Sequence, residues 1–126
     1  MFKTKDVHFA GDYPFKEKAI TASVQTSDVF KLGGTLGGIR IRGYADGTIT
    51  CKASDTVVAT LEVAETADAS AWTALESKTV TATGTSLIGD LFSFVTDTTA
   101  KYCRVTVKGA ADMTGTFSVA MELIPH

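Results

Sequence analysis

A period-two alternation of apolar and polar residues runs through most of this 126-residue sequence. Successive side chains of a β-strand point to opposite faces, so each alternating run predicts a strand with one dry face and one wet face. Thr, Arg, Lys and Glu fall mainly on the wet faces. The runs are residues 37–44, 56–65, 77–84, 101–109 and 115–124. Antiparallel sheets that cover one core typically show this pattern.

Short turn-forming segments separate these runs, and no segment sustains a helical period. Many short strands at this spacing predict an all-β fold, an antiparallel two-sheet sandwich of jelly-roll type. Asp46-Gly47 supplies the positive φ of a tight turn and predicts a hairpin there. Residues 109–115 are expected to form a longer hairpin loop between the last two strands. Residues 86–92 are the best candidate for a short helical turn, although Gly89 weakens it.

A chain of this length is one domain in size. We expect an extended N-terminal arm, residues 1–18, followed by the β-sandwich domain, residues 19–126. The arm shows no clean alternation, and Pro14 lacks the backbone donor that an interior strand needs. We therefore expect the arm to lie outside the core, so that a chain beginning near Ala19 still folds.

Apolar side chains in a polar arm suggest a surface that becomes ordered on a partner. Four aromatic residues are the predicted partner-binding residues: Phe2, Phe9, Tyr13 and Phe15. The alternative is that the arm simply folds back over the sandwich.

The chain's one tryptophan, Trp72, follows a small polar loop between two strand-like runs. It is either an exposed platform for a sugar ring or an apolar plug that seals one end of the core. A sugar platform normally needs several exposed aromatic side chains, and Tyr13, Tyr44 and Tyr102 form no stripe with it. We therefore predict that Trp72 is mostly buried between the sheets.

Cys51 and Cys103 fall on the apolar faces of their strands, where a free cysteine behaves as a small hydrophobic residue. The sequence has no Cys-x-x-Cys motif, and its N-terminus lacks the apolar stretch of a secretory signal. We therefore expect both thiols to be buried, reduced and unpaired.

Charge and motifs argue against several function classes. The net charge is −2, and the lysines near the N-terminus are mixed with acidic residues, so we expect no nucleic-acid partner. No apolar run is long enough to span a bilayer, so we expect no membrane partner. The histidines, His8 and His126, belong to no zinc motif, and no phosphate loop or nucleophile elbow is present. We expect no catalytic residue, cofactor or metal site, and we predict that the protein is not an enzyme.

Residues 60–82 and 101–123 resemble the small jelly-roll capsid cement (decoration) proteins of tailed bacteriophages, of the Bordetella phage type. The first stretch has a strand, a D-x-S-x-W segment at Asp68–Trp72 and a second strand. The second has an aromatic–x–Arg–Val strand at Tyr102–Val105, a loop rich in Gly and Thr, and a final alternating strand. As a pattern of strands and turns, the resemblance covers residues 19–123.

The resemblance implies a virion structural protein that binds the outer surface of the capsid between capsomers and stabilises the shell. It implies the major capsid protein as a partner and self-association into a homo-oligomer, either a trimer or a dimer. It places the protein on the capsid exterior after synthesis in the host cytoplasm. The alternative is a carbohydrate- or cell-surface-binding β-sandwich module of a phage tail or fibre.

Overall fold

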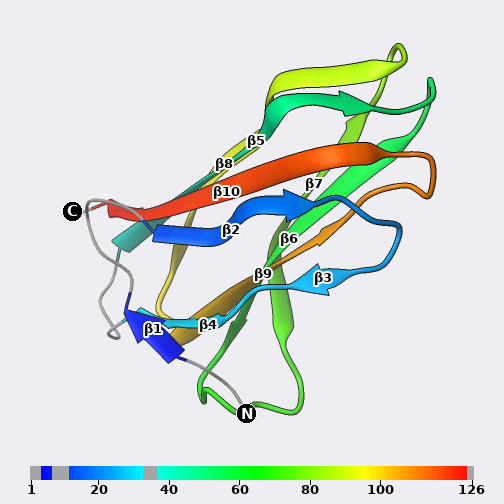
Figure 1. The fold of residues 1–126 in the computed structure, drawn as a ribbon. Helices are drawn as coiled ribbons and strands as arrows, with labels where there is room; N and C mark the ends of the chain where they lie inside the picture. The colour runs from blue at the N-terminus through cyan, green and yellow to red at the C-terminus, as the bar shows by residue number, and fades with distance from the viewer. Residues whose placement is uncertain (1–3, 7–11, 33–36, 125–126) are drawn as a thin grey trace.

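The computed structural model describes residues 4–6, 12–32 and 37–124, and these form two β-sheets packed face to face (Figure 1). In chain order the strands are β1 (Thr4–Asp6), β2 (Asp12–Ala19), β3 (Gln25–Thr26), β4 (Val29–Lys31), β5 (Gly37–Thr50), β6 (Thr56–Ala64), β7 (Thr73–Thr81), β8 (Ser86–Thr98), β9 (Tyr102–Lys108) and β10 (Thr114–Ile124). Within these residues no helix is long and apolar enough to cross a membrane. The predicted all-β sandwich of two antiparallel sheets is confirmed.

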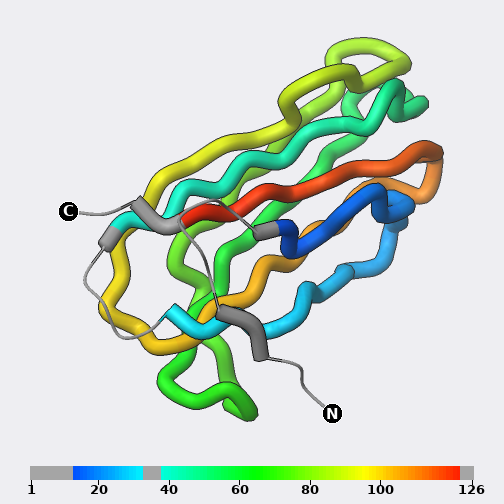
Figure 2. Tube along the Cα trace, turned by 60° about the vertical axis from the view of Figure 1, so that its left-hand side comes forward, coloured from blue at the N-terminus to red at the C-terminus, as the bar shows by residue number. Residues whose placement is uncertain are grey.

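The strand order is that of a jelly roll. Sheet A has the order β1-β4-β9-β6-β7, with β3 also paired to β9, and sheet B has the order β2-β10-β5-β8. If β3 and β4 are counted as one interrupted strand, the chain alternates between the sheets except at the β6–β7 hairpin, as in a double Greek key. The β2–β3 and β9–β10 connections lie side by side at one end of the sandwich (Figures 1 and 2).

The core lies between the two sheets and uses the apolar faces that the alternation predicted. Arg40 is exposed between the fully buried Ile39 and Ile41, as a period of two requires. Other side chains in this core, each at most 1% exposed, are Val57, Ala59, Leu61, Cys103, Val105, Val107, Phe117, Val119 and Met121. Their removal from water is the main favourable term in folding.

Strand β5 continues without a break through Asp46 and Gly47, so the hairpin predicted there is wrong. Gly47 does have a positive φ of 79°. However, the pairing of β5 with β8 only shifts in register between Tyr44 and Thr48 and then continues. The positive φ therefore serves a β-bulge that bends a long strand, which is a second common use of such a residue.

Two further turn predictions are also wrong. Residues 86–92 belong to strand β8 and not to a helical turn, and Gly89, with a φ of 72°, lies where the register with β5 shifts. Residues 109–113 join β9 in sheet A to β10 in sheet B, so they cross between sheets and do not close a hairpin. Alternation assigns side chains to faces, but it does not reveal which strands pair.

The segment expected to lie outside the core is, from Asp12 onward, the edge strand β2 of sheet B. Its residues pair with β10, with Phe15 opposite Val119. The expectation is therefore wrong for residues 12–18. Pro14 is compatible with an edge strand, because one side of such a strand needs no donor.

Candidate functional site

Of the four aromatic residues predicted to bind a partner, the structure describes two, Tyr13 and Phe15. Phe2 and Phe9 lie outside the described residues. The structure corrects the prediction for Phe15, which is only 6% exposed and whose ring centroid lies 5.2 Å from that of Phe117. Tyr13 is 47% exposed, and Lys16 Nζ lies 4.2 Å from the centroid of its ring. Partner binding by Tyr13 stays a prediction.

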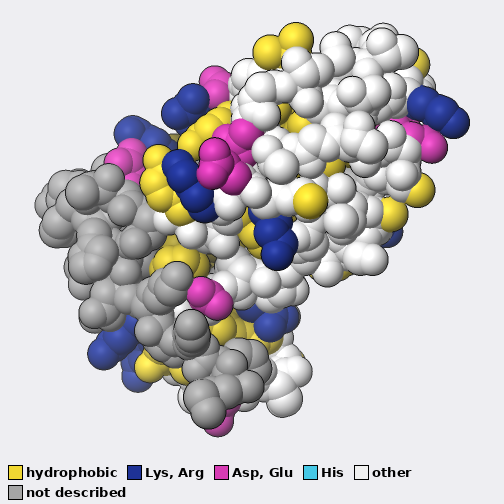
Figure 3. Space-filling model, viewed as in Figure 1, with side chains coloured by type: hydrophobic (Ala, Val, Ile, Leu, Met, Phe, Trp, Pro, Cys, Tyr) yellow, Lys and Arg dark blue, Asp and Glu magenta, His cyan; other side chains and the backbone are white. Residues whose placement is uncertain are grey.

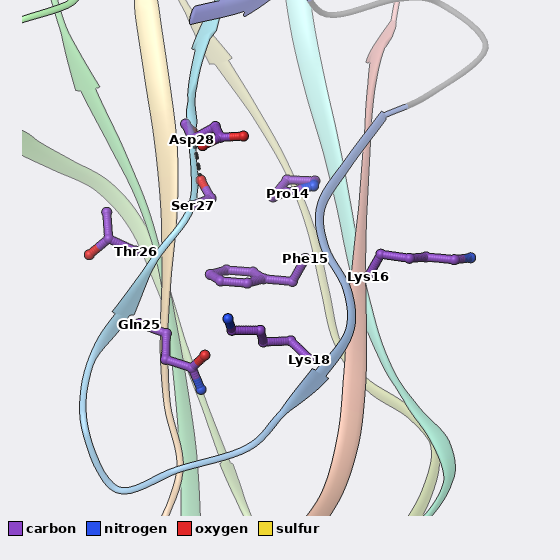
Figure 4. A pocket seen from close by; sticks show the side chains of 8 residues that line it. All are labelled: Pro14, Phe15, Lys16, Lys18, Gln25, Thr26, Ser27 and Asp28. Atoms are coloured by element: carbon purple, nitrogen blue, oxygen red, sulfur yellow. Dashed lines mark hydrogen bonds between the residues drawn. The ribbon is translucent and has the colours of Figure 1, made fainter. Parts of the chain in front are cut away.

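A cleft of about 420 Å³ opens between β2 and β3, where the edges of the two sheets part (Figure 4). Phe15 and Lys18 point from β2 toward β3, whereas Lys16 points away on the other side of the strand (Figure 4). In the described chain β2 pairs with β10 and β3 pairs with β9, so no hydrogen-bonded ladder closes the gap. The lining residues are Pro14, Phe15, Lys16, Lys18, Gln25, Thr26, Ser27 and Asp28.

Strand β2 is irregular where it borders the cleft. Its register against β10 shifts on both sides of Val119, and Glu17 has a φ of 47°. The Glu17 N–H donates to Ser118 Oγ at 2.9 Å, and that hydroxyl donates to Asp46 Oδ2 at 2.9 Å. Because Ser118 is fully buried, these hydrogen bonds hold the irregular strand firmly against sheet B.

Several polar groups that line the cleft are already hydrogen-bonded within the chain. Gln25 Nε2 donates to the Ala19 carbonyl at 2.8 Å, and the Ser27 hydroxyl accepts from the Val105 N–H at 2.9 Å. The Lys18 side chain projects into the cleft (Figure 4). The cleft therefore offers the Lys18 cation beside the Phe15 ring, with the Asp28 carboxylate on its β3 side, an arrangement that suits an extended segment with an acidic side chain placed near Lys18.

A second candidate site lies on the outer face of sheet A. Trp72 is partly buried but belongs neither to the core cluster nor to the side chains packed on it, so the prediction of a core plug is wrong. The guanidinium carbon of Arg104 lies 4.4 Å from the centroid of the Trp72 ring, and Trp72 Nε1 donates to the Ala69 carbonyl at 3.2 Å. Arg104 Nε donates to Glu62 Oε1 at 2.7 Å, with the two side chains 23% and 21% exposed.

The sequence analysis did not predict this cluster, although the two motifs that form it are visible in the sequence. Trp72 ends the D-x-S-x-W segment, and Arg104 is the arginine of the aromatic–x–Arg–Val strand. Glu62 is the direct cross-strand neighbour of Arg104 in the pairing of β6 with β9. The two motifs that carry the resemblance therefore meet in one surface cluster, which we call the Trp72 cluster and define as Glu62, Trp72 and Arg104.

Charged side chains on the outer face of sheet B pair across strands. Arg40 Nη1 lies 2.9 Å from Glu122 Oε1, and Arg42 Nε lies 2.9 Å from Asp90 Oδ1. In the space-filling view the two signs are interspersed among hydrophobic side chains (Figure 3). Where the side chains are coloured in this view, both charges are present with no large patch of one sign.

Both cysteines are free and buried, which confirms the predicted burial and lack of a disulfide. Cys103 is completely inaccessible, and burial raises the pKa of its thiol to about 12. Burial, with a smaller contribution from the Asp55 charge, also raises the pKa of Cys51. Both thiols therefore stay protonated near neutral pH and are poor nucleophiles there.

Within residues 4–6, 12–32 and 37–124, no group of three or more His, Cys, Asp and Glu side chains is placed to hold a metal ion. Every buried side-chain nitrogen or oxygen in that part of the chain has a hydrogen-bond partner.

No protein-family model matches the sequence, and no curated protein matches it. The fold is similar to that of the PBSX exported protein XepA, with a TM-score of 0.62 at 13% identity over 92% of this chain and 37% of that chain. It is also similar to a structure of infectious bursal disease virus, Gx strain, with a TM-score of 0.52 at 12% identity over 88% of this chain and 31% of that chain. A CBM4 structure aligns with a TM-score of 0.42 at 13% identity over 90% of this chain and 73% of that chain.

This chain spans about a third of the length of the first two proteins. At these identities the first two similarities show the fold alone. They define the chain as a β-sandwich protein, whose fold also occurs in a phage protein and in a virus structure.

Proposed function

We propose that the protein is a virion structural protein, a cement protein that binds the outer surface of a capsid between capsomers and stabilises the shell. The observation that carries this proposal is the Trp72 cluster. Its members come from the two separate stretches that resemble cement proteins, and they contact one another directly. When motif residues from two separate stretches contact one another in the fold, the resemblance of both stretches to one family is better supported. The jelly-roll strand order agrees with this proposal. The fold is also similar to those of a phage protein and a virus structure.

In this function the shell contacts the β2 edge of the sandwich. Tyr13 is exposed on that edge beside Lys16, and Lys18 projects into the cleft next to it. An extended segment of a capsid protein that enters the cleft places apolar groups against Phe15 and an acidic side chain near Lys18. Stable interfaces bury about 800 Å² per partner, so this edge is the centre of a larger contact.

The test is co-sedimentation of the purified protein with shells assembled from the major capsid protein of the same genome. We expect saturable binding and a higher melting temperature of the decorated shell. Lys18→Glu should weaken binding, because it reverses the charge in the cleft, and Tyr13→Ala should weaken it by removing an exposed ring. Lys108→Glu, an exposed position on sheet A, is the matched control and should bind normally. Absence of binding at any protein-to-shell ratio would refute the proposed function.

One observation favours the alternative, a carbohydrate-binding module. Trp72 is partly exposed beside a charged pair, and an aromatic face with adjacent polar groups is a common sugar-binding arrangement. Since Trp72 is the chain's one tryptophan, its fluorescence reports on this site alone. Saturable quenching by an oligosaccharide, lost in Arg104→Ala, would support the alternative. A glycan screen without any fluorescence change or melting shift would exclude it.

A further inference from the structure

The edges of the two sheets are not equally protected against pairing with another chain. Edge strands expose unpaired N–H and C=O groups, and natural proteins blunt them with proline, bulges or short length. Strand β2 carries Pro14, register shifts and the positive φ of Glu17, and β8 carries a shift beside Gly89. Strands β1 and β3 are only three and two residues long.

Strand β7, the other edge of sheet A, is neither short nor interrupted by proline, and its protection is charge. It has nine residues, Thr73–Thr81, with neither proline nor glycine among them. It is the outermost strand of sheet A, next to β6. Its pairing with β6 has one register shift, between Leu61 and Glu62, and is regular from Thr56 to Leu61. Residues 77–79 are exposed, so this edge is open to a partner strand.

The sequence of β7 is complementary to itself when two copies run antiparallel. If Ser77 lies opposite Ser77 of a second copy, Glu76 lies opposite Lys78 of that copy, and Lys78 lies opposite its Glu76. The same register places Thr79 opposite Leu75, the extra residue of β7 against β6, where the regular part of the strand ends. Opposite charges directly across a strand pair are stabilising, and like charges there are destabilising. A register that repeats under a two-fold rotation produces a closed dimer.

The two charges also explain why this edge would reject other strands. In the pairing with β6, Lys78 lies opposite Ala59 and Glu76 lies opposite Leu61, and both β6 residues are fully buried. Glu76 and Lys78 therefore lie on the inner side of sheet A, at its margin, where charged residues normally prevent edge-to-edge pairing. Neither forms an ion pair with another described residue. An incoming strand without matching charges would leave them uncompensated, whereas a second β7 compensates both.

We propose that the protein forms a dimer through antiparallel pairing of β7 with β7 of a second copy, about a two-fold axis at Ser77. Sheet A then continues from one copy to the other. The inference rests on the proposed function, in which the protein self-associates, and it selects the dimer over the trimer. It leaves the β2 edge free, because β2 and β7 belong to different sheets.

The test is the solution mass of the full chain by analytical ultracentrifugation over a dilution series. The unaltered protein should dimerise. Glu76→Lys or Lys78→Glu alone should weaken the dimer by about tenfold or more, because each places like charges opposite one another twice. The double variant E76K/K78E should restore the dimer, because exchanging the two charges preserves the complementarity. Lys108→Glu, at an exposed position on β9, is the matched control and should leave the mass unchanged.

Failure of this inference is separable from failure of the proposed function. A monomer at every soluble concentration, a trimer, or a double variant that stays as weak as the single ones would overturn the β7 pairing. Shell binding by the same variants tests the proposed cement function. A dimer that follows the predicted charge pattern but never binds shells would retain the interface and reject the cement function.

Discussion

The guanidinium carbon of Arg104 lies 4.4 Å from the centroid of the Trp72 ring, on the outer face of sheet A. Trp72 ends the connection between β6 and β7, and Arg104 lies on β9, so the contact ties this connection to the sheet. The same arginine donates to Glu62 on the intervening strand β6. The ring thus packs against a cation outside the core, and its removal should cost less than removal of a core aromatic.

Trp72→Ala should lower the free energy of unfolding by about 1–2 kcal/mol, since it loses a cation–π contact and partly buried area. Phe117→Ala, at a fully buried position, should lose about 3–5 kcal/mol. Urea unfolding followed by circular dichroism measures both losses. In a double-mutant cycle, Trp72→Ala and Arg104→Ala should show a coupling of about 0.5–1 kcal/mol. Equal losses at Trp72 and Phe117 would instead place the tryptophan in the core.

Ser118→Ala should destabilise the β2 edge more than the small change in volume implies. The hydroxyl of Ser118, which is fully buried, accepts from the Glu17 N–H and donates to Asp46. The substitution removes these hydrogen bonds. The groups left behind belong to Glu17, which is exposed, and Asp46, which is half-buried, so they can turn to water and the loss is that of the hydrogen bonds themselves, about 1–2 kcal/mol. Hydrogen exchange should show faster opening of residues 12–19, and Thr79→Ala, at an exposed position, should not. Unchanged protection in β2 would show that the strand does not depend on this serine.

The residues that face the core could be predicted because that property is local. The alternation around Val57, Leu61 and Val105 fixes their shared orientation once they are in strands. Strand pairing is not local, and this is why the predictions for Gly47 and for residues 109–115 were wrong. A positive φ serves a bulge as well as a turn, and a connection looks the same whether it closes a hairpin or crosses between sheets.

The candidate sites were harder to predict for related physical reasons. The register shifts of β2 break the period of two around Phe15, so a core residue looked like part of an irregular arm. The size of Trp72 suggested burial, but its ring also offers a face to a cation and an N–H to a carbonyl. Its partner Arg104 lies 32 residues away in the sequence, and only the pairing of β6 with β9 brings it close.

The buried thiol of Cys103 predicts a loss of stability at alkaline pH. Its pKa rises from 9.0 to about 12 on folding, so the folded state retains a proton that the unfolded state releases. This contribution is fully present below pH 9 and is lost as the pH rises from about 9 toward 12, by up to about 1.4 kcal/mol per pH unit. The unfolding free energies of the natural protein and of Cys103→Ala should therefore converge over this range.

Thiol labelling checks the same group independently. At neutral pH Cys103 should react very slowly in the folded protein, and both cysteines should react once the chain is unfolded without a reductant. A constant difference between the two proteins across the alkaline range would contradict the pKa shift. Absence of free thiols after unfolding would contradict the unpaired state.

The last prediction concerns the N-terminal segment and replaces the expectation that a chain beginning at Ala19 still folds. That shortened chain lacks most of β2, and with it Phe15, whose ring packs on Phe117 in the core. Loss of a buried Phe alone costs about 3–5 kcal/mol, and the exposed edge of β10 adds to this. Because a domain is typically stable by only about 5–15 kcal/mol, the chain from Ala19 should be barely folded or unfolded.

A chain shortened to begin at Asp12 is the matched comparison. It keeps all of β2 and loses the three-residue strand β1, so it should unfold at a urea concentration near that of the full chain. Circular dichroism and urea titration of both shortened chains separate the two cases. If the chain from Ala19 unfolded at the same midpoint as the full chain, β2 would contribute nothing to the sandwich, and the packing of Phe15 against Phe117 would have no energetic weight.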